Sequence, residues 1–301
     1  MNVYDTIIIG AGISGLTAAM YAARKRMKFE ILSNNFGGQF NISGEVLNYP
    51  GIVKTTGLEF SSVMEKQMEF NDVKVKTEIV KKLEKMGSNF KVTSDKGSYE
   101  TQTVIICTGS NARKLGVPGE QRLANKGVTY CSICDGPVFS GMDVAIIGGG
   151  DAGLEAVDFM KDLAEKIYLV VRGKEFTAHE YLQEKVKSNP KVEVLYNTET
   201  KEILGDKFVN GLRYEQDGEE KTLSVKGVII EIGRVANTGI FKGTVPLDED
   251  GHIMIDCQAK TPVPGIFAAG DCASGHEYQY VISAGQGCMA LIKAARHLAS
   301  K

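Results

Sequence analysis

Short apolar runs that end in glycine recur along the chain, and each is followed by a stretch with helical character. Residues 3–9 form such a run, and the alanine-rich residues 16–25 after it suit a helix. The same order returns further along, with an apolar run at residues 144–147 and a helical stretch at residues 154–163. The pattern predicts two strand–turn–helix units of an α/β protein.

A second repeat lies downstream of each unit. Residues 104–109 and 228–233 are apolar strand-like runs that both end in glycine, and each follows its own strand–turn–helix unit. Between the units, residues 77–96 alternate charged and apolar positions, which predicts strands with one solvated face. We therefore expect an α/β fold with two Rossmann-like, three-layer nucleotide-binding domains.

Composition narrows the class of protein. The chain has 301 residues, which at roughly 150 residues per domain gives about two domains. The 35 basic and 37 acidic side chains leave a formal charge of -2, too balanced for a general nucleic-acid binder. No apolar run reaches the ~18 residues of a membrane span, and no secretory signal is visible. We expect a cytoplasmic protein without nucleic-acid or membrane partners.

The turn after the first strand has the spacing of a phosphate-binding loop. Gly10 permits a tight turn, Gly12 lets the backbone approach a pyrophosphate, and Gly15 lets the helix pack on the strand. The helix N-terminus would then face the negative charge. A glycine turn without a ligand is the alternative. The second turn repeats the pattern with Gly148, Gly150, Asp151, Ala152 and Gly153.

An acidic residue that binds a ribose is expected ~20 positions after the first turn. Glu30 has this spacing, but residues 28–32 read as the second strand, so Glu30 would lie inside it. Ligands sit at the carboxyl ends of such strands. Ser33 is therefore the better candidate for the ribose.

Cys131 and Cys134 are the only close cysteine pair among six cysteines. Three interpretations remain open, namely a redox dithiol, half of a zinc site, or two buried thiols. Structural zinc requires about four ligands, and the other cysteines and histidines show no matching spacing, so we expect no metal site. In the redox interpretation the spacing lowers a thiol pKa, and Asp135 either moves the proton or forms a turn before Gly136.

These motifs together resemble the low-molecular-weight thioredoxin reductases over residues 4–298. No single motif carries the resemblance. It rests on the first glycine turn, Gly37-Gly38-Gln39, Asn48-Tyr49-Pro50-Gly51, Thr108-Gly109, the segment from Cys131 to Gly136, the second glycine turn, Gly270-Asp271-Cys272, Gln279 and Ala284-Gly285-Gln286-Gly287.

The resemblance implies a discontinuous FAD-binding domain, residues 1–113 and 245–301, with a nicotinamide-nucleotide-binding domain, residues 114–244, inserted into it. The inserted domain would carry the redox cysteines. The implied FAD residues are Gly10, Gly12, Ser14, Gly15, Ser33, Gly38, Gln39, Asn48, Thr108, Gly109, Gly270, Asp271 and Gln279. The implied nicotinamide residues are Gly148, Gly150, Asp151, Ala152, Gly153 and Arg172.

The implied reaction passes a hydride from a reduced nicotinamide to FAD, after which the Cys131–Cys134 disulfide is opened with Asp135 as acid and base. The Cys131 thiolate would attack the disulfide of a thioredoxin-like partner, and Cys134 would resolve the mixed disulfide. Both redox partners must reach the flavin in turn, so the two units would move relative to each other. The family also implies a homodimer.

The sequence departs from the family where the donor would bind. NADPH-dependent members carry several arginines and a histidine after the second strand of the inserted domain, but here only Arg172 matches, with Lys174 nearby. NADPH remains the favoured donor, and NADH, ferredoxin and a reduced deazaflavin remain alternatives. Tyr278 replaces the usual arginine before Gln279, where it either packs on the flavin or fills core space.

Two other functions stay open. A flavin-dependent dithiol oxidase that uses oxygen would have lost its nicotinamide site, which the second glycine turn argues against. A flavin-binding scaffold without activity would leave the cysteine spacing unexplained. His179, His252, His276 and His297 have no nearby acid or cysteine at a spacing that suggests a site, so we expect surface or core histidines.

Overall fold

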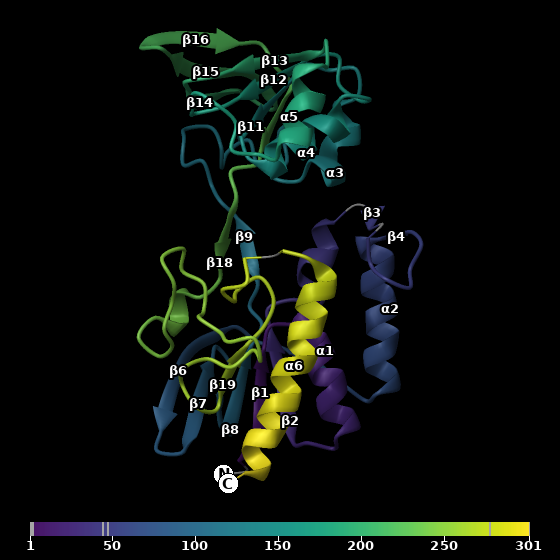
Figure 1. The fold of residues 1–301 in the computed structure, drawn as a ribbon, viewed down its shortest axis with the longest axis vertical. Helices are drawn as coiled ribbons and strands as arrows, with labels where there is room; N and C mark the ends of the chain where they lie inside the picture. Colours follow the sequence, from purple (N-terminus) through teal and green to yellow (C-terminus); the bar gives the residue numbers. More distant parts are fainter. Residues whose placement is uncertain (1–2, 44, 47, 277, 301) are drawn as a thin grey trace. The chain divides into compact units, whose positions relative to one another are not determined.

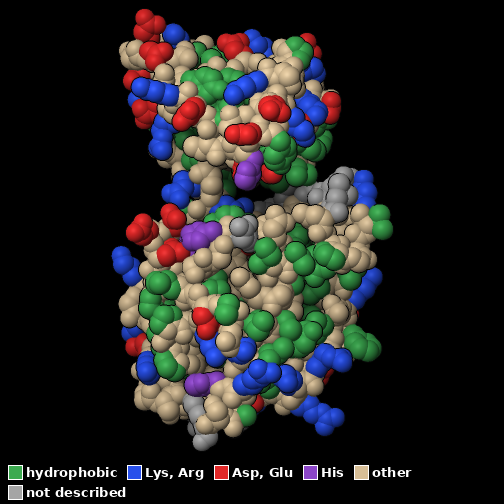
Figure 2. Space-filling view, in the orientation of Figure 1, with side chains coloured by type: hydrophobic (Ala, Val, Ile, Leu, Met, Phe, Trp, Pro, Cys, Tyr) green, Lys and Arg blue, Asp and Glu red, His purple; other side chains and the backbone are tan. Residues whose placement is uncertain are grey.

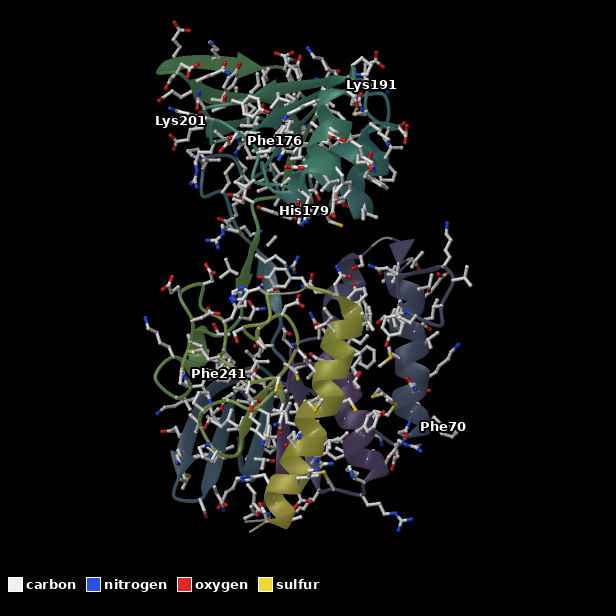
Figure 3. All side chains as sticks on the ribbon, viewed as in Figure 1. Phe70, Phe176, His179, Lys191, Lys201 and Phe241 are labelled. Carbon is white, nitrogen blue, oxygen red and sulfur yellow. The ribbon has the colours of Figure 1, made fainter. Side chains whose placement is uncertain are left out.

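The computed structural model describes residues 3–43, 45–46, 48–276 and 278–300, and divides the chain into two compact units. Unit 1 comprises Met1–Asn111 and Val235–Lys301, and unit 2 comprises Ala112–Arg234. The second boundary therefore lies ten residues earlier than the predicted one at 244/245. The reason is packing, because Phe241 is fully buried in the core of unit 1 beside Val245 (Figure 3).

Unit 1 is built on one seven-stranded sheet in the order β5-β2-β1-β8-β7-β6, with β19 also paired to β8. The pairs among β5, β2, β1, β8 and β19 are parallel, whereas β6, β7 and β8 form an antiparallel meander. The bounds are β1 Tyr4–Ile9, β2 Phe29–Ser33, β5 Val75–Thr77, β6 Val80–Met86, β7 Asn89–Ser94, β8 Ser98–Ile106 and β19 Ile266–Ala268.

Both faces of this sheet are buried, which explains why the second half of its central strand, Ile7–Ile9, is a continuous apolar run. Ile8 of β1 faces the core formed with helices α1 (Ile13–Arg24), α2 (Gly57–Phe70) and α6 (Tyr280–Ala299). Ile7 and Ile9 face the opposite core. Helices α1 and α6 pack side by side along the first face (Figure 1).

Unit 2 has a five-stranded parallel sheet in the order β10-β17-β11-β12-β13 and a separate antiparallel sheet β14-β15-β16. Helices α3 (Ser132–Asp135), α4 (Asp151–Met160) and α5 (Glu180–Lys187) belong to this unit. The strands are β10 Val128–Thr129, β11 Val144–Ile147, β12 Ile167–Val170, β13 Val192–Leu195, β14 Thr198–Gly205, β15 Val209–Gln216, β16 Glu219–Leu223 and β17 Gly227–Ile230.

The chain passes between the units twice, within two short strands that pair with each other, β9 (Ser110–Ala112) and β18 (Arg234–Ala236). The remaining elements are β3 Glu45–Val46, β4 Thr55–Thr56 and the 3-10 helices η1 Gly38–Ile42, η2 Gly136–Phe139 and η3 Gly239–Phe241. Among the helices of the described ranges, none has both the length and the hydropathy that crossing a membrane requires.

Candidate functional site

The first glycine turn joins β1 to α1, and its close contacts explain why glycine occupies it. Gly10 has a left-handed backbone (φ +105°), and a Cβ there would lie 2.2 Å from the Cys107 carbonyl oxygen. A Cβ on Gly15 would lie 1.9 Å from the Gly10 carbonyl oxygen. These two glycines bring the first turn of α1 against the end of β1. Gly10 and Gly15 are therefore required for the close packing of the turn, whereas Gly12 has free space around it.

Gly12 is the N-cap of α1, and no side chain caps this helix. A Cβ on Gly12 would have no heavy atom within 4 Å, so the space over the helix N-terminus is open. The first N–H groups of a helix have no partner within the helix and attract anions. The turn therefore offers backbone donors and room for a pyrophosphate, which fits the expected FAD.

Two distant segments meet this turn. A Cβ on Gly38 would lie 3.1 Å from the Cα atom of Gly12. A Cβ on Gly270 would lie 2.8 Å from Oγ of Ser14, which is buried. The structure thus brings Gly10, Gly12, Ser14, Gly15, Gly38 and Gly270 together.

Asp271 follows β19 and is held by two hydroxyl groups. The Ser110 hydroxyl donates to its carboxylate at 3.1 Å, and the Ser283 hydroxyl donates at 3.4 Å. Gln39 reaches the same neighbourhood, since its side-chain amide donates to the carbonyl oxygen of Ser110 at 3.0 Å. Asp271 is thus oriented at the carboxyl end of the sheet, where parallel α/β folds bind ligands.

The other predicted residues of unit 1 lie on its loops and strand ends. The Asn48 amide donates to the Gln279 side-chain oxygen at 3.1 Å. Gly109 has φ +65°, and the carbonyl oxygen of Thr108 accepts the Asn237 amide at 3.0 Å. Ser33 is the last residue of β2 and is buried. Glu30 lies within β2, where the Tyr4 hydroxyl and Lys76 contact it, as expected for a strand residue.

The second glycine turn repeats the first one in unit 2. Gly148 has φ +144°, and a Cβ there would lie 2.0 Å from the Glu231 carbonyl oxygen. A Cβ on Gly153 would lie 2.2 Å from the Gly148 carbonyl oxygen. Gly150 is the N-cap of α4 and, like Gly12, has no side-chain cap above the helix. The geometry fits a second nucleotide phosphate.

Carboxylates surround this second turn, which distinguishes it from the first. Asp151 is the first residue of α4, and its Oδ1 accepts the backbone N–H of His179 at 2.7 Å. Partial desolvation and the charge of Asp151 raise the pKa of Glu155, one turn further along the helix. Ala152 is exposed, and Arg172 is an exposed cation just after β12.

The cysteine segment lies between β10 and β11. Cys131 is half-buried and disulfide-bonded, while the side chain of Cys134 lies outside the described residues. The Thr129 hydroxyl donates to the Asp135 carboxylate and accepts the Cys131 backbone N–H at 3.2 Å. Thr129 therefore connects the predicted acid–base residue to the backbone of the predicted nucleophile. A Cβ on Gly136 would lie 2.7 Å from the Met160 sulfur, so this segment packs closely on α4.

Glu231 is a site residue that sequence reasoning missed. It follows β17, and the backbone N–H of Ser132, next to Cys131, hydrogen-bonds to its carboxylate. Burial raises the pKa of Glu231 to about 7, and Glu155 adds to the rise. A carboxyl group with this pKa exchanges protons near neutral pH. Positions 132 and 231 lie far apart in the sequence and no motif connects them. The sequence alone therefore could not identify Glu231 as a site residue.

His252 is buried and His276 is exposed, as expected of core and surface histidines, but the expectation that no acid lies at a suggestive spacing missed Asp248. Both lie close to Asp248, and His252 follows it by four residues, a spacing that was visible in the sequence. His276 comes from a distant segment and joins them only through the fold. These three residues are also the described group that could hold a metal ion, although the sequence predicted none.

The remaining buried thiols are not reactive candidates. Cys107 and Cys272 are buried in the core of unit 1, and burial raises the pKa of both thiols. A thiol with a raised pKa is a poor nucleophile at neutral pH. Cys257 is an exposed free cysteine.

Comparison with known proteins gives relatives along nearly the whole chain. The chain is 40% identical over 295 residues to a subunit of alkyl hydroperoxide reductase from Staphylococcus aureus, which covers 97% of this chain and 58% of that protein. This chain thus spans somewhat more than half the length of that relative. Among solved structures, thioredoxin reductase of Lactococcus lactis has a TM-score of 0.87 at 32% identity, covering 99% of this chain and 100% of that chain.

Thioredoxin reductase of T. acidophilum also matches, with a TM-score of 0.83 and 32% identity, over 100% of this chain and 99% of that chain. The predicted resemblance to thioredoxin reductases and the predicted α/β fold with two nucleotide-binding domains are confirmed. A family model described as pyridine nucleotide-disulphide oxidoreductase matches residues 4–297. The chain therefore belongs to the pyridine nucleotide-disulphide oxidoreductase family.

Proposed function

We propose that this chain is an FAD-dependent disulfide reductase that passes electrons from a reduced pyridine nucleotide, through Cys131 and Cys134, to a thioredoxin-like protein. The observation that carries the proposal is the disulfide-bonded Cys131 in unit 2, whose backbone is connected by Thr129 to the carboxylate of Asp135. A scaffold without activity would not need a reversible disulfide next to an acid.

Unit 1 would hold the FAD. The open N-terminus of α1 at Gly12 suits the pyrophosphate, Ser33 suits the ribose, and Asp271 suits the ribityl hydroxyls. When bound, FAD supplies two-electron redox chemistry between the donor and the disulfide. The residues of this chain bind the cofactor, orient it and handle the protons.

The thiol chemistry then belongs to unit 2. After reduction, the Cys131 thiolate attacks one sulfur of the partner's disulfide, and that disulfide breaks as a mixed disulfide forms. Cys134 attacks the Cys131 sulfur, which releases the reduced partner and restores the Cys131–Cys134 disulfide. Two partner thiolates are released in these steps. One takes the proton that Cys134 loses when it attacks, and the other takes a proton for which Asp135, held by the Thr129 hydroxyl, is our proposed donor.

The donor is the least specified part of this proposal. Arg172 and Lys174 are both exposed after β12, and they supply the positive charge available for the 2'-phosphate of NADPH. Fewer such contacts weaken the preference for NADPH over NADH, and the carboxylates of Asp151 and Glu155 add negative charge nearby. NADPH is our proposed donor, and NADH, ferredoxin and a reduced deazaflavin are the alternatives to test.

An anaerobic titration tests the whole scheme. NADPH, NADH and reduced ferredoxin are added separately to the FAD-loaded protein while flavin bleaching is followed, and reduction of a thioredoxin-like disulfide is measured in parallel. We expect bleaching by a pyridine nucleotide. The Cys131→Ser variant should retain bleaching and lose disulfide turnover, whereas Cys257→Ser, which removes an exposed free thiol, should retain both. Bleaching by ferredoxin alone would contradict the donor assignment.

A second candidate concerns the final acceptor. The chain is 40% identical to a subunit of alkyl hydroperoxide reductase and 32% identical to the thioredoxin reductases above. The higher identity to the hydroperoxide reductase subunit favours a second function, in which this chain supplies electrons for hydroperoxide reduction through the same Cys131–Cys134 pair. Adding a peroxide-reducing thiol protein and an alkyl hydroperoxide to the titration distinguishes the candidates, since only the second predicts donor oxidation coupled to peroxide loss.

A homodimer in the cytoplasm completes the proposal. Exposed hydrophobic side chains gather on the face of unit 1 over α6, including Val281, Ile282 and Met289 (Figure 2). Exposed apolar patches on soluble proteins often mark interfaces. Four free cysteines favour a reducing compartment. Size-exclusion chromatography with light scattering measures the oligomeric state directly, and a monomer at micromolar concentration would contradict the dimer.

A further inference from the structure

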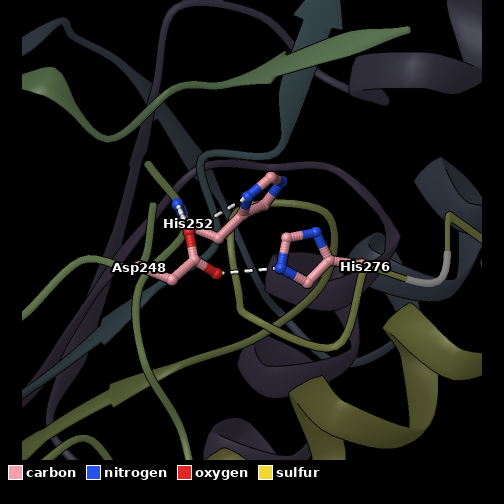
Figure 4. Close-up of side chains that lie close together, drawn as sticks. All are labelled: Asp248, His252 and His276. Carbon is pink, nitrogen blue, oxygen red and sulfur yellow. Dashed lines mark hydrogen bonds and ion pairs between the residues drawn. The ribbon is translucent and has the colours of Figure 1, made fainter. Parts of the chain in front are cut away.

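Two loops of unit 1 bring three metal-binding side chains together. Asp248 and His252 lie on a turn, and the residues at its two ends, Leu247 and Ile253, form an isolated antiparallel bridge. His276 lies on the segment after Asp271, which pairs with the first loop through Ile253 and Ala273. The possible ligand atoms of Asp248, His252 and His276 all lie within 4.8 Å of one another (Figure 4).

His252 has a free coordination position pointing into this cluster. Its side chain is only 2% exposed. Its Nε2 hydrogen-bonds to the Tyr278 hydroxyl at 3.0 Å, but its Nδ1 has no hydrogen-bond partner and lies 3.6 Å from Oδ1 of Asp248. A buried polar atom without a partner destabilises the folded state, so native proteins rarely keep one without a reason.

Asp248 offers a carboxylate that is held in place. Its Oδ1 accepts the backbone N–H groups of Asp250 at 3.1 Å and of His252 at 2.8 Å, and its Oδ2 contacts Nε2 of His276 at 2.8 Å. These contacts fix the carboxylate between the two imidazoles, with Oδ1 at 3.6 Å from His252 Nδ1 and Oδ2 at 2.8 Å from His276 Nε2. A carboxylate oxygen is one of the ligands that zinc uses.

We propose that Asp248, His252 and His276 form a binding site for a divalent transition metal ion, with Zn²⁺ as the expected ion. Two imidazoles and one carboxylate are a ligand set that zinc uses, with metal–ligand distances of about 2.0–2.2 Å. Binding at His252 Nδ1 fixes the proton on Nε2, which then donates to Tyr278. This arrangement is the usual orienting contact behind a metal-bound histidine.

A simple histidine–carboxylate ion pair does not account for the cluster. His179 and Asp151 in unit 2 form such a pair at 3.5 Å, but the His179 side chain is 77% exposed, and no third ligand group joins them among the described residues (Figure 3). The cluster in unit 1 adds a buried imidazole and a second histidine to the carboxylate. His179 is therefore a matched control.

The metal would tie the Asp248–His252 turn to the segment that leads to Tyr278 and Gln279. Tyr278 stands where the related reductases usually have an arginine, and its hydroxyl contacts the buried His252. The site is independent of the dithiol, since the three ligands all belong to unit 1. Zinc binding therefore does not depend on the donor or on the final acceptor.

Metal content of the intact chain tests the proposal. Protein with an intact disulfide, in a Cys257→Ser background, is stripped with a chelator and dialysed against Zn²⁺, and bound metal is measured by atomic absorption. We expect about one ion per chain and a rise in thermal stability on addition of Zn²⁺. Co²⁺, used as a second probe, should give the visible absorption of a site with nitrogen and oxygen ligands.

Three variants decide the assignment. His276→Ala removes a ligand whose side chain is 42% exposed, so the fold should survive while Zn²⁺ affinity falls by more than about 100-fold. Tyr278→Phe removes only the orienting hydroxyl and should weaken binding by roughly 10- to 100-fold. His179→Ala should bind like the parent. A parent that binds no stoichiometric Zn²⁺, or binding that survives His276→Ala, overturns the proposal.

Discussion

The carboxyl group of Glu231 should make the stability of the protein depend on pH. Burial raises the pKa of Glu231 from 4.5 to about 7. The folded state therefore holds this proton more tightly than the unfolded state, and the resulting stability is fully present below pH ~4.5 and is lost as pH rises through about 7. The side chain of Glu231 is partly exposed to solvent, which screens its charge. The free energy of unfolding should therefore fall by about 1–3 kcal/mol over this pH range.

The Glu231→Gln variant tests this sign. Glutamine keeps an oxygen that can accept the Ser132 N–H but cannot ionise, so the variant should match the parent near pH ~4 and exceed its free energy of unfolding by about 1–3 kcal/mol near pH ~8. Urea unfolding at both pH values measures the difference. Glu184→Gln, on an exposed position of α5, should change neither value. Equal pH dependence in the parent and the Glu231 variant would contradict the prediction.

Single residues could be predicted from the sequence only where neighbours along the chain define them. Gly10, Gly12 and Gly15 form one local turn, so their roles follow from spacing. Glu231 contacts Ser132, and His276 contacts Asp248, only because the fold brings distant segments together. No periodicity or spacing encodes such contacts. The sequence therefore predicts the phosphate turns, the cysteine pair and Asp135 beside it, but neither Glu231 nor the contact between Asp248 and His276.

Among the elements, the turn between β1 and α1 makes two glycines experimentally distinguishable. A Cβ at Gly15 would lie 1.9 Å from the Gly10 carbonyl oxygen, whereas a Cβ at Gly12 would have no heavy atom within 4 Å. Gly15→Ala should therefore destabilise the protein without FAD by about 1–3 kcal/mol. Gly12→Ala should leave that stability within about 0.5 kcal/mol but weaken FAD binding at least about tenfold, because the methyl group enters the open space over the helix.

Urea unfolding of the FAD-free protein and flavin fluorescence titration separate these effects. Gly97→Ala is the control, since a Cβ there, on the exposed turn between β7 and β8, also has no heavy atom within 4 Å. It should change neither stability nor FAD affinity by an amount comparable to the two turn variants. If Gly12→Ala binds FAD like the parent, the pyrophosphate does not lie over this helix N-terminus.

Elements with strong local patterns occur where the sequence predicts them, but the starts of two helices differ from the predicted ones. The strand at Val144–Ile147 has the predicted bounds, but α1 and α4 begin at Ile13 and Asp151, three residues before the predicted starts. Gly12 and Gly150 are N-caps, so the glycine turn already includes the first helical residues. The sheet β14-β15-β16 was not predicted from its segment, because its pairing depends on register between strands rather than on apolar runs.

At the scale of the whole molecule, the two units have separate hydrophobic cores. The two buried clusters of unit 1 include residues from both of its chain segments, such as Ile7 and Phe241. The two clusters of unit 2 contain only residues between Leu115 and Ile232. No cluster among the described residues draws from both units. Such a division predicts domains that can fold independently.

Excision tests this independence. A fragment of residues 112–234 should unfold cooperatively in urea, because its parallel sheet and both of its cores are complete. The two segments of unit 1 can be joined by a short Gly/Ser linker between Asn111 and Val235. These two ends lie close together, because Asn111 donates a side-chain hydrogen bond to Asn237 at 2.9 Å. This shortened chain should bind FAD like the parent, since every proposed FAD residue lies in unit 1.

The excised units also separate cofactor binding from electron transfer. Closed unit 1 should retain the flavin spectrum, yet a mixture of it with the 112–234 fragment should reduce a thioredoxin-like disulfide far more slowly than the intact chain. The covalent connection keeps the dithiol at a high effective concentration near the flavin, and two separate molecules lose that advantage. Circular dichroism, flavin absorbance and disulfide turnover measure the three properties. Loss of FAD binding by closed unit 1 would show that unit 2 completes the flavin site. Full disulfide turnover by the mixture would show that the covalent connection between the units has no role in electron transfer.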